Sequence, residues 1–483
     1  MRKWLPLVAI CLGAFILLVD VTIVNVALPR MADDLDASFS SLQWVMDIYA
    51  LALASLLMFT GSLADLFGHR RLYAAGLTVF ALASLGCALA PNAAVLVASR
   101  GVQGIGGAAM FATSAALVSA TYQGRDRGTA FGVWGAVNGA AAAAGPVLGG
   151  LLTQGFGWQA IFLVNLPIAV AAVYLTLKVL PAGSRGAGRL DLPGAAVFTL
   201  AAAALTYALI RGGEHGWGDT GTVTAFVIAG AAAVAFVPVE LLAPHPMLDL
   251  ALLRRPSFAG LLGGALLLQG AAFGGLVFVS LWLQNVLRLG PIRGGLALMP
   301  MALTSFVVAL LVGRFTHRAA PRIPIGVGLL GIAAGSALLY AGVSAGSGQY
   351  ALVAGLAVAG VGVGLSTPVL VSAAVAAVPP QRAGMASAAV NTARQLGMTL
   401  GIAVFGALFS SRLRHVVSGG GSIRAAYASG LDRVFLVSTI GALLGALVVL
   451  ALVRHAQPSV TGAPVPSPAS PSRDPEPATP AAN

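Results

Sequence analysis

The sequence predicts an all-α integral membrane protein with about 14 transmembrane helices. Of its 483 residues, 58% are hydrophobic and only 9% are charged, and the mean hydropathy is +0.91. Soluble domains carry about 25% charged residues, so this composition excludes an ordinary soluble domain. The apolar residues lie in long runs, and about 20 of them suffice to cross a bilayer. The 61 glycines agree with this, because small residues let helices pack closely in lipid.

The apolar runs follow one another along the chain and are separated by short polar loops. Arg2 and Lys3 precede the first run, which continues beyond residue 20 without a cleavage pattern, so we expect a retained helix rather than a signal peptide. The expected spans lie at about 5–27, 44–60, 72–90, 94–120, a fifth after 127, a sixth opening at 157–169, and then 192–210, 222–242, 258–283, 295–312, 323–341, 350–375, 386–409 and 434–453.

The net charge of +12 indicates membrane topology rather than a nucleic-acid partner. The basic residues stand singly or in pairs between apolar runs and do not form one cluster. An even number of spans places both termini on the same side of the membrane. Most of the basic residues fall in loops on that side, so both termini are expected in the cytoplasm. Cys11 and Cys87 both lie within apolar runs, which provides neither a disulfide framework nor a metal-ligand spacing.

The apolar segment 44–60 ends in the polar stretch GSLADLFGHRR. Its glycines allow tight backbone geometry, its carboxylate stands where it can cap the next helix, and its arginines face the membrane surface. We therefore expect a rigid cytoplasmic turn between two antiparallel helices. The residues concerned are Gly61, Asp65, Gly68, Arg70 and Arg71.

Two acidic residues fall within or near the hydrocarbon layer. Asp20 lies 15 residues beyond Leu5, or about 22 Å along a helix at about 1.5 Å per residue. A carboxyl group at that depth must face the bundle interior or a wet cavity, where it either carries protons or bonds to a neighbouring helix for structural reasons. Asp47 follows the interfacial residue Trp44 and is either a second proton carrier or a charge at the entrance.

Three further spans carry polar or small residues in a helical pattern. Arg100 and Gln103 share one face of the fourth span, and Arg100 either snorkels to the surface or pairs with a buried acid. In the fifth span Ala141, Gly145 and Gly149 form a smooth face, and Pro146 predicts a kink. The thirteenth span carries Asn391, Arg394 and Gln395 among small and apolar residues.

These patterns resemble motifs of the major facilitator superfamily of transporters. The polar stretch with Asp65 is similar to the loop that is thought to latch the two halves of such transporters, although Leu66 and His69 replace basic residues common there. The first-helix run DVTIVNVALP and the thirteenth span resemble those of the fourteen-helix drug:proton antiporter branch. The pattern of the fourth span resembles a motif of the family for which a role in proton coupling is implied. The pattern of the fifth span resembles a motif that marks exporters running as antiporters. The residues that carry these last likenesses are Asp20, Asn25, Arg100, Gln103, Gly145, Pro146, Gly149, Gly150, Asn391, Arg394 and Gln395.

The resemblance implies two six-helix bundles with two additional linking helices. We accordingly expect an N-terminal bundle at 1–180, a linker with two extra spans at 181–256, a C-terminal bundle at 257–456 and a disordered tail at 457–483, which is rich in Pro, Ser and Ala. Basic loops that echo one another after the second and tenth spans agree with repeated halves and a site between them.

The expected function is proton-coupled export of small lipophilic compounds, cationic or amphipathic, such as antibiotics. No phosphate-binding glycine-rich loop is present, so we expect no cofactor and no ATPase subunit, and a proton gradient as the energy source. The expected partners are the small-molecule substrate, protons and the lipid bilayer of the cytoplasmic membrane. Two alternatives remain open at this point: a proton-coupled nutrient symporter and an integral-membrane enzyme. The six histidines are dispersed one by one, which counts against the enzyme.

Overall fold

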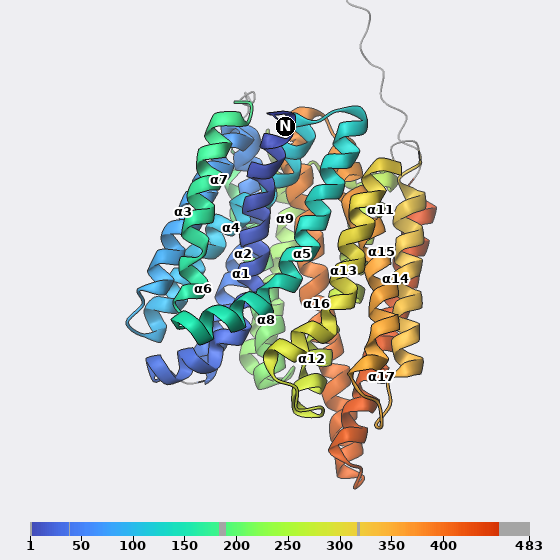
Figure 1. Cartoon of the computed structure of the whole chain (residues 1–483). Helices are drawn as coiled ribbons and strands as arrows, with labels where there is room; N and C mark the ends of the chain where they lie inside the picture. Colours follow the sequence, from blue (N-terminus) through green and yellow to red (C-terminus); the bar gives the residue numbers. More distant parts are fainter. Residues whose placement is uncertain (1, 38, 183–189, 316–318, 454–483) are drawn as a thin grey trace, which may run out of the picture.

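The computed structural model describes residues 2–37, 39–182, 190–315 and 319–453 (Figure 1). These residues form helices and connecting loops and no strand, so the expected all-helical character is confirmed. The tail expected at 457–483 and part of the linker expected at 181–256 lie outside the described residues.

The helices follow the expected order of spans. Thirteen of them are long and apolar enough to cross a membrane, and α5 makes a fourteenth if its two parts count as one span. These parts, Gly124–Ala141 and Ala144–Phe156, are bent by 44°. The bend lies one turn before Pro146, which has no N–H for the carbonyl of residue 142 and clashes with it, so the kink predicted from this proline is present.

The principal helices have the following bounds: α1 (Leu5–Leu35), α2 (Phe39–Phe67), α3 (His69–Ala88), α4 (Ala93–Thr121), α5 (Gly124–Phe156), α6 (Ala160–Leu163), α7 (Asn165–Val179), α8 (Leu192–His215), α9 (Thr220–Leu242), α10 (Leu250–Leu253), α11 (Pro256–Phe273), α12 (Leu276–Asn285), α13 (Pro291–Phe315), α14 (Arg322–Gly342), α15 (Leu352–Ala376), α16 (Ala383–Ser418) and α17 (Ile423–Leu452).

The polar stretch after residue 60 is not a turn over its whole length. Gly61 and Asp65 both lie inside α2, and the chain reverses at Gly68, whose φ of 96° suits glycine. The expected extended turn was therefore wrong, because the stretch has good helix formers in LADLF and needs no more than one glycine to break the helix. As a result α2 projects beyond the apolar segment at the end of the molecule that carries the N-terminus (Figure 1).

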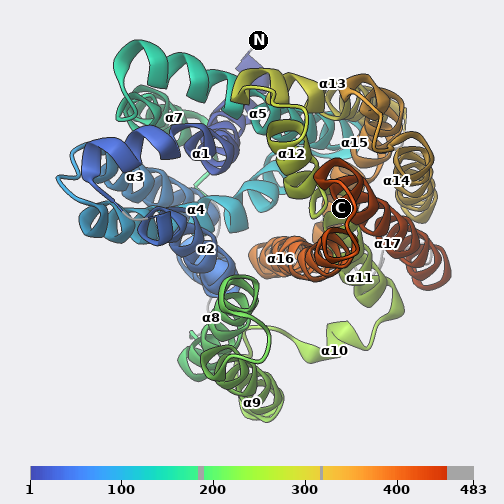
Figure 2. The same cartoon turned by 90° about the horizontal axis from the view of Figure 1, so that it is seen from below.

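Early and late helices of the chain pack both among themselves and against each other. Among the early helices, α1 contacts α5 and α7, and α4 contacts α2 and α3. Among the late helices, α11 contacts α15, α16 and α17, and α14 contacts α15 and α17. The early and late helices meet where α5 contacts α13 and where α2 and α4 contact α16. The pair α8 and α9 lies at the edge of the molecule and contacts α2 and α16 through α8 (Figure 2).

Candidate functional site

Asp20 is held by three side chains in the interior. It has no exposed surface, and its Oδ2 accepts a hydrogen bond of 2.5 Å from Nη1 of Arg100. Its Oδ1 accepts one of 2.8 Å from Nε2 of Gln103 and one of 3.3 Å from Nδ2 of Asn165. The carboxylate in the middle of α1 is thus tied to α4 and α7 at once.

Arg100 is enclosed rather than snorkelling. Only 1% of it is exposed, and besides Asp20 it donates to the carbonyl oxygen of Val45 and to Oε1 of Gln103, at 3.0 and 2.8 Å. The ring of Tyr49 lies 4.2 Å from its guanidinium carbon, a cation–π contact. Of the two alternatives for this residue, the structure shows the pair with a buried acid. Removing one partner of such a pair costs about 3–5 kcal/mol, because the other charge stays buried.

Two members of this cluster were not predicted. Asn165 and Ser84 complete the polar network, since the Ser84 hydroxyl accepts hydrogen bonds from Gln103 at 2.9 Å and from Asn165 at 3.3 Å. Asn165 stands alone in the apolar run FLVNLPIA, which is a signal that the sequence offers. The sequence gives no signal for Ser84, because serine is common in membrane helices, where its hydroxyl can bond to the backbone of its own helix.

The other two polar candidates of the first half are placed differently. Asp47 is half-buried on α2, two residues after Val45, whose carbonyl oxygen accepts from Arg100. Asn25 belongs to α1, and its side chain lies outside the described part of the chain. Asp47 and Asn25 therefore stay predictions.

Asp65 connects an early helix to a late one. Its Oδ1 and Oδ2 accept hydrogen bonds of 2.8 Å from the backbone N–H groups of Gly384 and Met385, the first turn of α16. The expectation that Asp65 caps the next helix in the chain was wrong: the carboxylate caps a distant helix, because residue 65 lies inside α2 and faces α16. A negative charge at a helix N-terminus is stabilising by about 0.3–1 kcal/mol, and by up to about 2 when partly buried.

The residues around Asp65 reinforce this contact. A methyl group at Gly61 would lie 2.9 Å from the carbonyl oxygen of Gly384, so only glycine lets α2 and α16 approach so closely. Arg70 donates from Nη1 to the carbonyl of Leu180 and from Nη2 to that of Leu177, at 3.1 and 2.5 Å, at the end of α7. Arg71 is exposed. We call the contact of Asp65 and Gly61 with the first turn of α16 the α2–α16 latch.

Replacing Asp65 by Asn is expected to open the α2–α16 latch. The amide keeps one acceptor oxygen, but it points an N–H group at a backbone N–H group and removes the negative charge. The population of molecules with a closed latch should therefore fall about 5- to 30-fold, which corresponds to about 1–2 kcal/mol. The measurement is maleimide labelling of Ser387→Cys, a site on α16 that is fully buried here. Asp126→Asn is the matched control, because Asp126 pairs with Lys3 on the surface. Equal labelling rates in the parent and both variants would refute the latch.

The small residues of α5 contact α1 next to Asp20. A methyl group at Gly149 would lie 2.8 Å from the carbonyl oxygen of Ile23, and one at Gly145 would lie 2.8 Å from Cβ of Thr22. On another face of α5, Gly150 lies against Ile292, and Pro146 lies against Gly295 of α13. The small-residue face of α5 thus lies against the turn of α1 that follows Asp20.

The candidates of the second half lie on α16. Asn391 donates to the carbonyl oxygen of Phe111 on α4, and Arg394 donates to Oδ1 of Asn391, both at 3.2 Å. Arg394 also donates to Oε1 of Gln269 at 3.3 Å. Gln395 is half-buried beside them. Asn391 and Arg394 are therefore brought together with a helix of the first half, and Gln269 is a partner that the sequence did not indicate.

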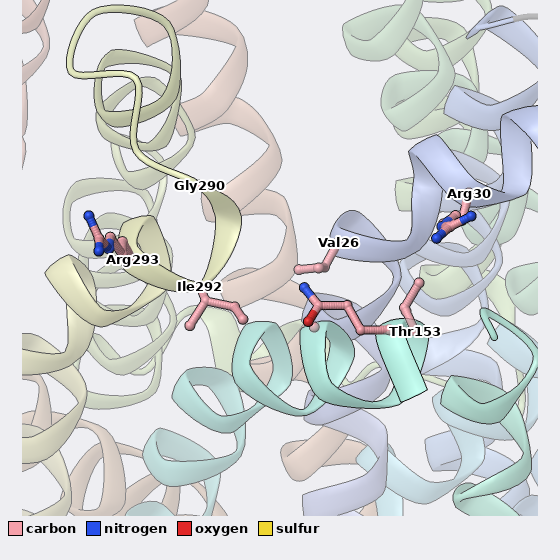
Figure 3. A pocket seen from close by; sticks show the side chains of 8 residues that line it. Val26, Arg30, Thr153, Gly290, Ile292 and Arg293 are labelled. Atoms are coloured by element: carbon pink, nitrogen blue, oxygen red, sulfur yellow. The ribbon is translucent and has the colours of Figure 1, made fainter. Parts of the chain in front are cut away.

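Cavities lie between the helices in the described part of the chain, and two of them are near the residues of the site. The larger, of about 520 Å³, opens at the end opposite the N-terminus and is lined by Val26, Arg30, Gly150, Thr153, Gln154, Gly290, Ile292 and Arg293 (Figure 3). The smaller, of about 10 Å³, is lined by Gly13, Ala14, Leu17, Leu18, Met110, Phe111, Ser114 and Asn138. Asp20 lines neither, and Val26 lies about 9 Å beyond it along α1.

Comparison with known protein families decides the classification. The profile of the Major Facilitator Superfamily matches residues 10–402, which is most of the chain. The chain belongs to the major facilitator superfamily. Proteins of this superfamily are transporters, which excludes the alternative of an integral-membrane enzyme and confirms the resemblance of the sequence motifs.

Curated relatives within the superfamily are named for drug and antibiotic resistance. The multidrug resistance protein Stp of Mycobacterium tuberculosis is 38% identical over 411 residues, which cover 85% of this chain and 76% of Stp. The methylenomycin A resistance protein of Streptomyces coelicolor is 34% identical over 404 residues, which cover 83% of this chain and 85% of that protein. Both alignments span most of the membrane helices.

A solved structure shows the same fold. The crystal structure of the human organic anion transporter MFSD10 aligns with a TM-score of 0.64 over 93% of this chain and 98% of that one, at 17% sequence identity. The chain is therefore a multi-pass membrane transporter of major facilitator fold.

Proposed function

We propose that this chain is a proton-coupled antiporter that exports small lipophilic compounds, such as antibiotics, across the cytoplasmic membrane by alternating access. The observation that carries the proposal is the pair of Asp20 and Arg100, a carboxylate and a guanidinium without contact to water in the middle of the helices. Buried ionisable groups in membrane helices mark ion and proton pathways. The names of the curated relatives support export of drugs.

The proton step acts through this pair. When Asp20 takes up a proton it becomes neutral, and the ionic part of its bond to Arg100 is lost. Arg100 keeps the carbonyl of Val45 and the amide oxygen of Gln103 as acceptors, so it stays hydrogen-bonded, while α1 is held to α4 more weakly, through the bond from Gln103 to Asp20. Loss of the proton on the other side of the membrane restores the ion pair and the original packing.

The moving parts in this proposal are the helices of 1–180 and those of 257–456, as two bundles with α8 and α9 attached at the side. The α2–α16 latch closes the end of the molecule that carries the N-terminus, while the larger cavity is open at the opposite end. With both termini in the cytoplasm, this conformation is closed inwards and open outwards. The exchange between the inward-open and outward-open states depends on the contact between α5 and α1, where the two helices move against each other.

A nutrient symporter is less well supported. Its fold would be the same, but the curated relatives of this chain are named for drug and antibiotic resistance, and the small-residue face of α5 is similar to that of antiporting exporters.

The test is drug transport under an imposed pH gradient. We expect a host without its own pumps to gain resistance to a subset of a drug panel when it expresses the chain. Everted membrane vesicles should accumulate the same drugs when their lumen is acidic, and a protonophore should reduce uptake to that of empty-vector vesicles. Uptake that needs ATP and resists the protonophore would overturn the proposal.

A further inference from the structure

Arg394 is a buried cation without an acidic partner. Only 9% of it is exposed, and it donates hydrogen bonds to the amide oxygens of Gln269 and Asn391. Among the described residues, no carboxylate oxygen lies within 4.0 Å of its nitrogens. Arg100, which is also buried, is by contrast neutralised by Asp20. Neutral amides compensate a guanidinium incompletely, so Arg394 retains charge to offer to a ligand.

The second half of the chain has almost no acid that could approach Arg394 during movement. Between residues 250 and 473 the sequence holds one carboxylate, Asp432. That residue lies on α17 near Arg412 and Arg433, which attract it electrostatically. The carboxylate at the centre of the first half, Asp20, is occupied by Arg100.

A second buried polar group, the amide of Asn138, lies in the first half of the chain. Asn138 of α5 is 7% exposed, and neither its Nδ2 nor its Oδ1 has a hydrogen-bond partner. It lines the smaller cavity, which has room for about one water molecule. A buried amide left unsatisfied costs about 1–3 kcal/mol per group, so its retention in an apolar wall points to a ligand.

Phe111 stands between the two polar groups. Its ring lies 5.6 Å from the guanidinium carbon of Arg394, and the residue lines the smaller cavity with Asn138 and Ser114. Its carbonyl oxygen accepts the amide of Asn391. A turn of this ring, or a separation of α4 from α16, would join the cavity to the guanidinium.

The charged side chains that line the larger cavity are both positive. Arg30 and Arg293 are the charged residues that line it, from α1 and α13, and no acid does so among the described residues (Figure 3). Thr153 of the same wall is buried, and its hydroxyl has no hydrogen-bond partner. The larger cavity therefore offers two cations, the smaller one offers neutral polar groups, and no carboxylate among the described residues lines either.

We propose that the exported compounds carry an anionic oxygen, a carboxylate or phenolate, on an aromatic or lipophilic frame, and that Arg394 pairs with this oxygen in the smaller cavity once it has opened. Asn138 donates an amide hydrogen to the same group, and Phe111 packs against the apolar frame. This inference rests on the proposed export function and narrows its substrate class. It replaces the sequence-based expectation of a cationic compound, for which the cavity walls offer no carboxylate.

Binding of three probes with one fluorophore tests the charge preference. Dansyl-glycine is an anion, dansyl-glycinamide is neutral, and N-dansyl-ethylenediamine is a cation at pH 7. The full chain in lipid nanodiscs should bind the anion about 10- to 100-fold more tightly than the other two, as expected for a hydrogen-bonded charge pair. Arg394→Gln should reduce this preference to within about twofold, and Arg394→Lys should keep part of it.

Arg322→Gln is the matched control, because Arg322 is an exposed arginine at the start of α14 and should leave the preference unchanged. A purely structural role of Arg394 would lower stability without changing the ratio between anion and amide. The proposal is overturned if the parent binds all three probes equally, if it shows no saturable binding of dansyl-glycine, or if Arg394→Gln keeps the preference. Transport of a cation under a pH gradient, with no anion preference, would overturn this inference and leave the export function standing.

Discussion

Replacing Asp20 by Asn is expected to abolish efflux driven by a pH gradient. The amide has nearly the same shape and can still accept from Gln103 and Asn165, but it cannot take up or release a proton. Arg100 would at the same time lose its counter-charge in the interior, at a cost of about 3–5 kcal/mol. Drug uptake by everted vesicles should fall to that of vesicles without the protein, while the amount of protein in the membrane, measured by immunoblot, stays comparable.

Further variants of Asp20 and Arg100 separate the loss of proton coupling from the loss of stability. The double variant Asp20→Asn with Arg100→Gln removes both charges, so it should recover part of the lost stability while efflux remains absent. Asp20→Glu keeps an ionisable group and should keep partial efflux. Undiminished efflux by Asp20→Asn, with the dependence on the pH gradient retained, would mean that this carboxylate serves packing only.

The sequence predicted the helices well because their signal is local. A run of about 20 apolar residues must be a helix in lipid, whatever its neighbours are. The kink of α5 was equally local, since Pro146 acts on the carbonyl one turn before it. The polar stretch at Asp65 was wrongly predicted to be a turn because charged residues are typical of loops between membrane spans. Its residues are good helix formers, and α2 continues through them beyond the apolar segment.

The partners of the site residues were harder to predict because they depend on tertiary contacts. Sequence spacing indicated that Arg100 and Gln103 share a face, but the contact with Asp20 joins residues 80 positions apart. The contact of Asp65 with α16 joins residues more than 300 positions apart, and no local pattern specifies it. Asn138 and Gln269 each appear in the sequence as one amide in an apolar run, and only the packing shows which of them has a partner.

Replacing Gly149 by Leu is expected to stop transport by shifting the conformational equilibrium. Even a methyl group at this position would lie 2.8 Å from the carbonyl oxygen of Ile23, and a backbone atom cannot rotate away as a side chain can. Overpacking of this kind costs about 1–3 kcal/mol, which changes a two-state ratio about 5- to 150-fold. Because the clash is with the packing observed here, the conformation with the closed α2–α16 latch should become the minor one.

Cysteine labelling at the two ends measures this shift. Ile292→Cys reports on the larger cavity and Ser387→Cys on the end closed by the latch, and the native Cys11 and Cys87 are buried. With Gly149→Leu, labelling should rise at residue 387 and fall at residue 292. Gly155→Leu is the control on the same helix, because nothing lies within 4 Å of a methyl group there. If both ends of Gly149→Leu label as in the parent, α5 does not move against α1, and the exchange between states must use another contact.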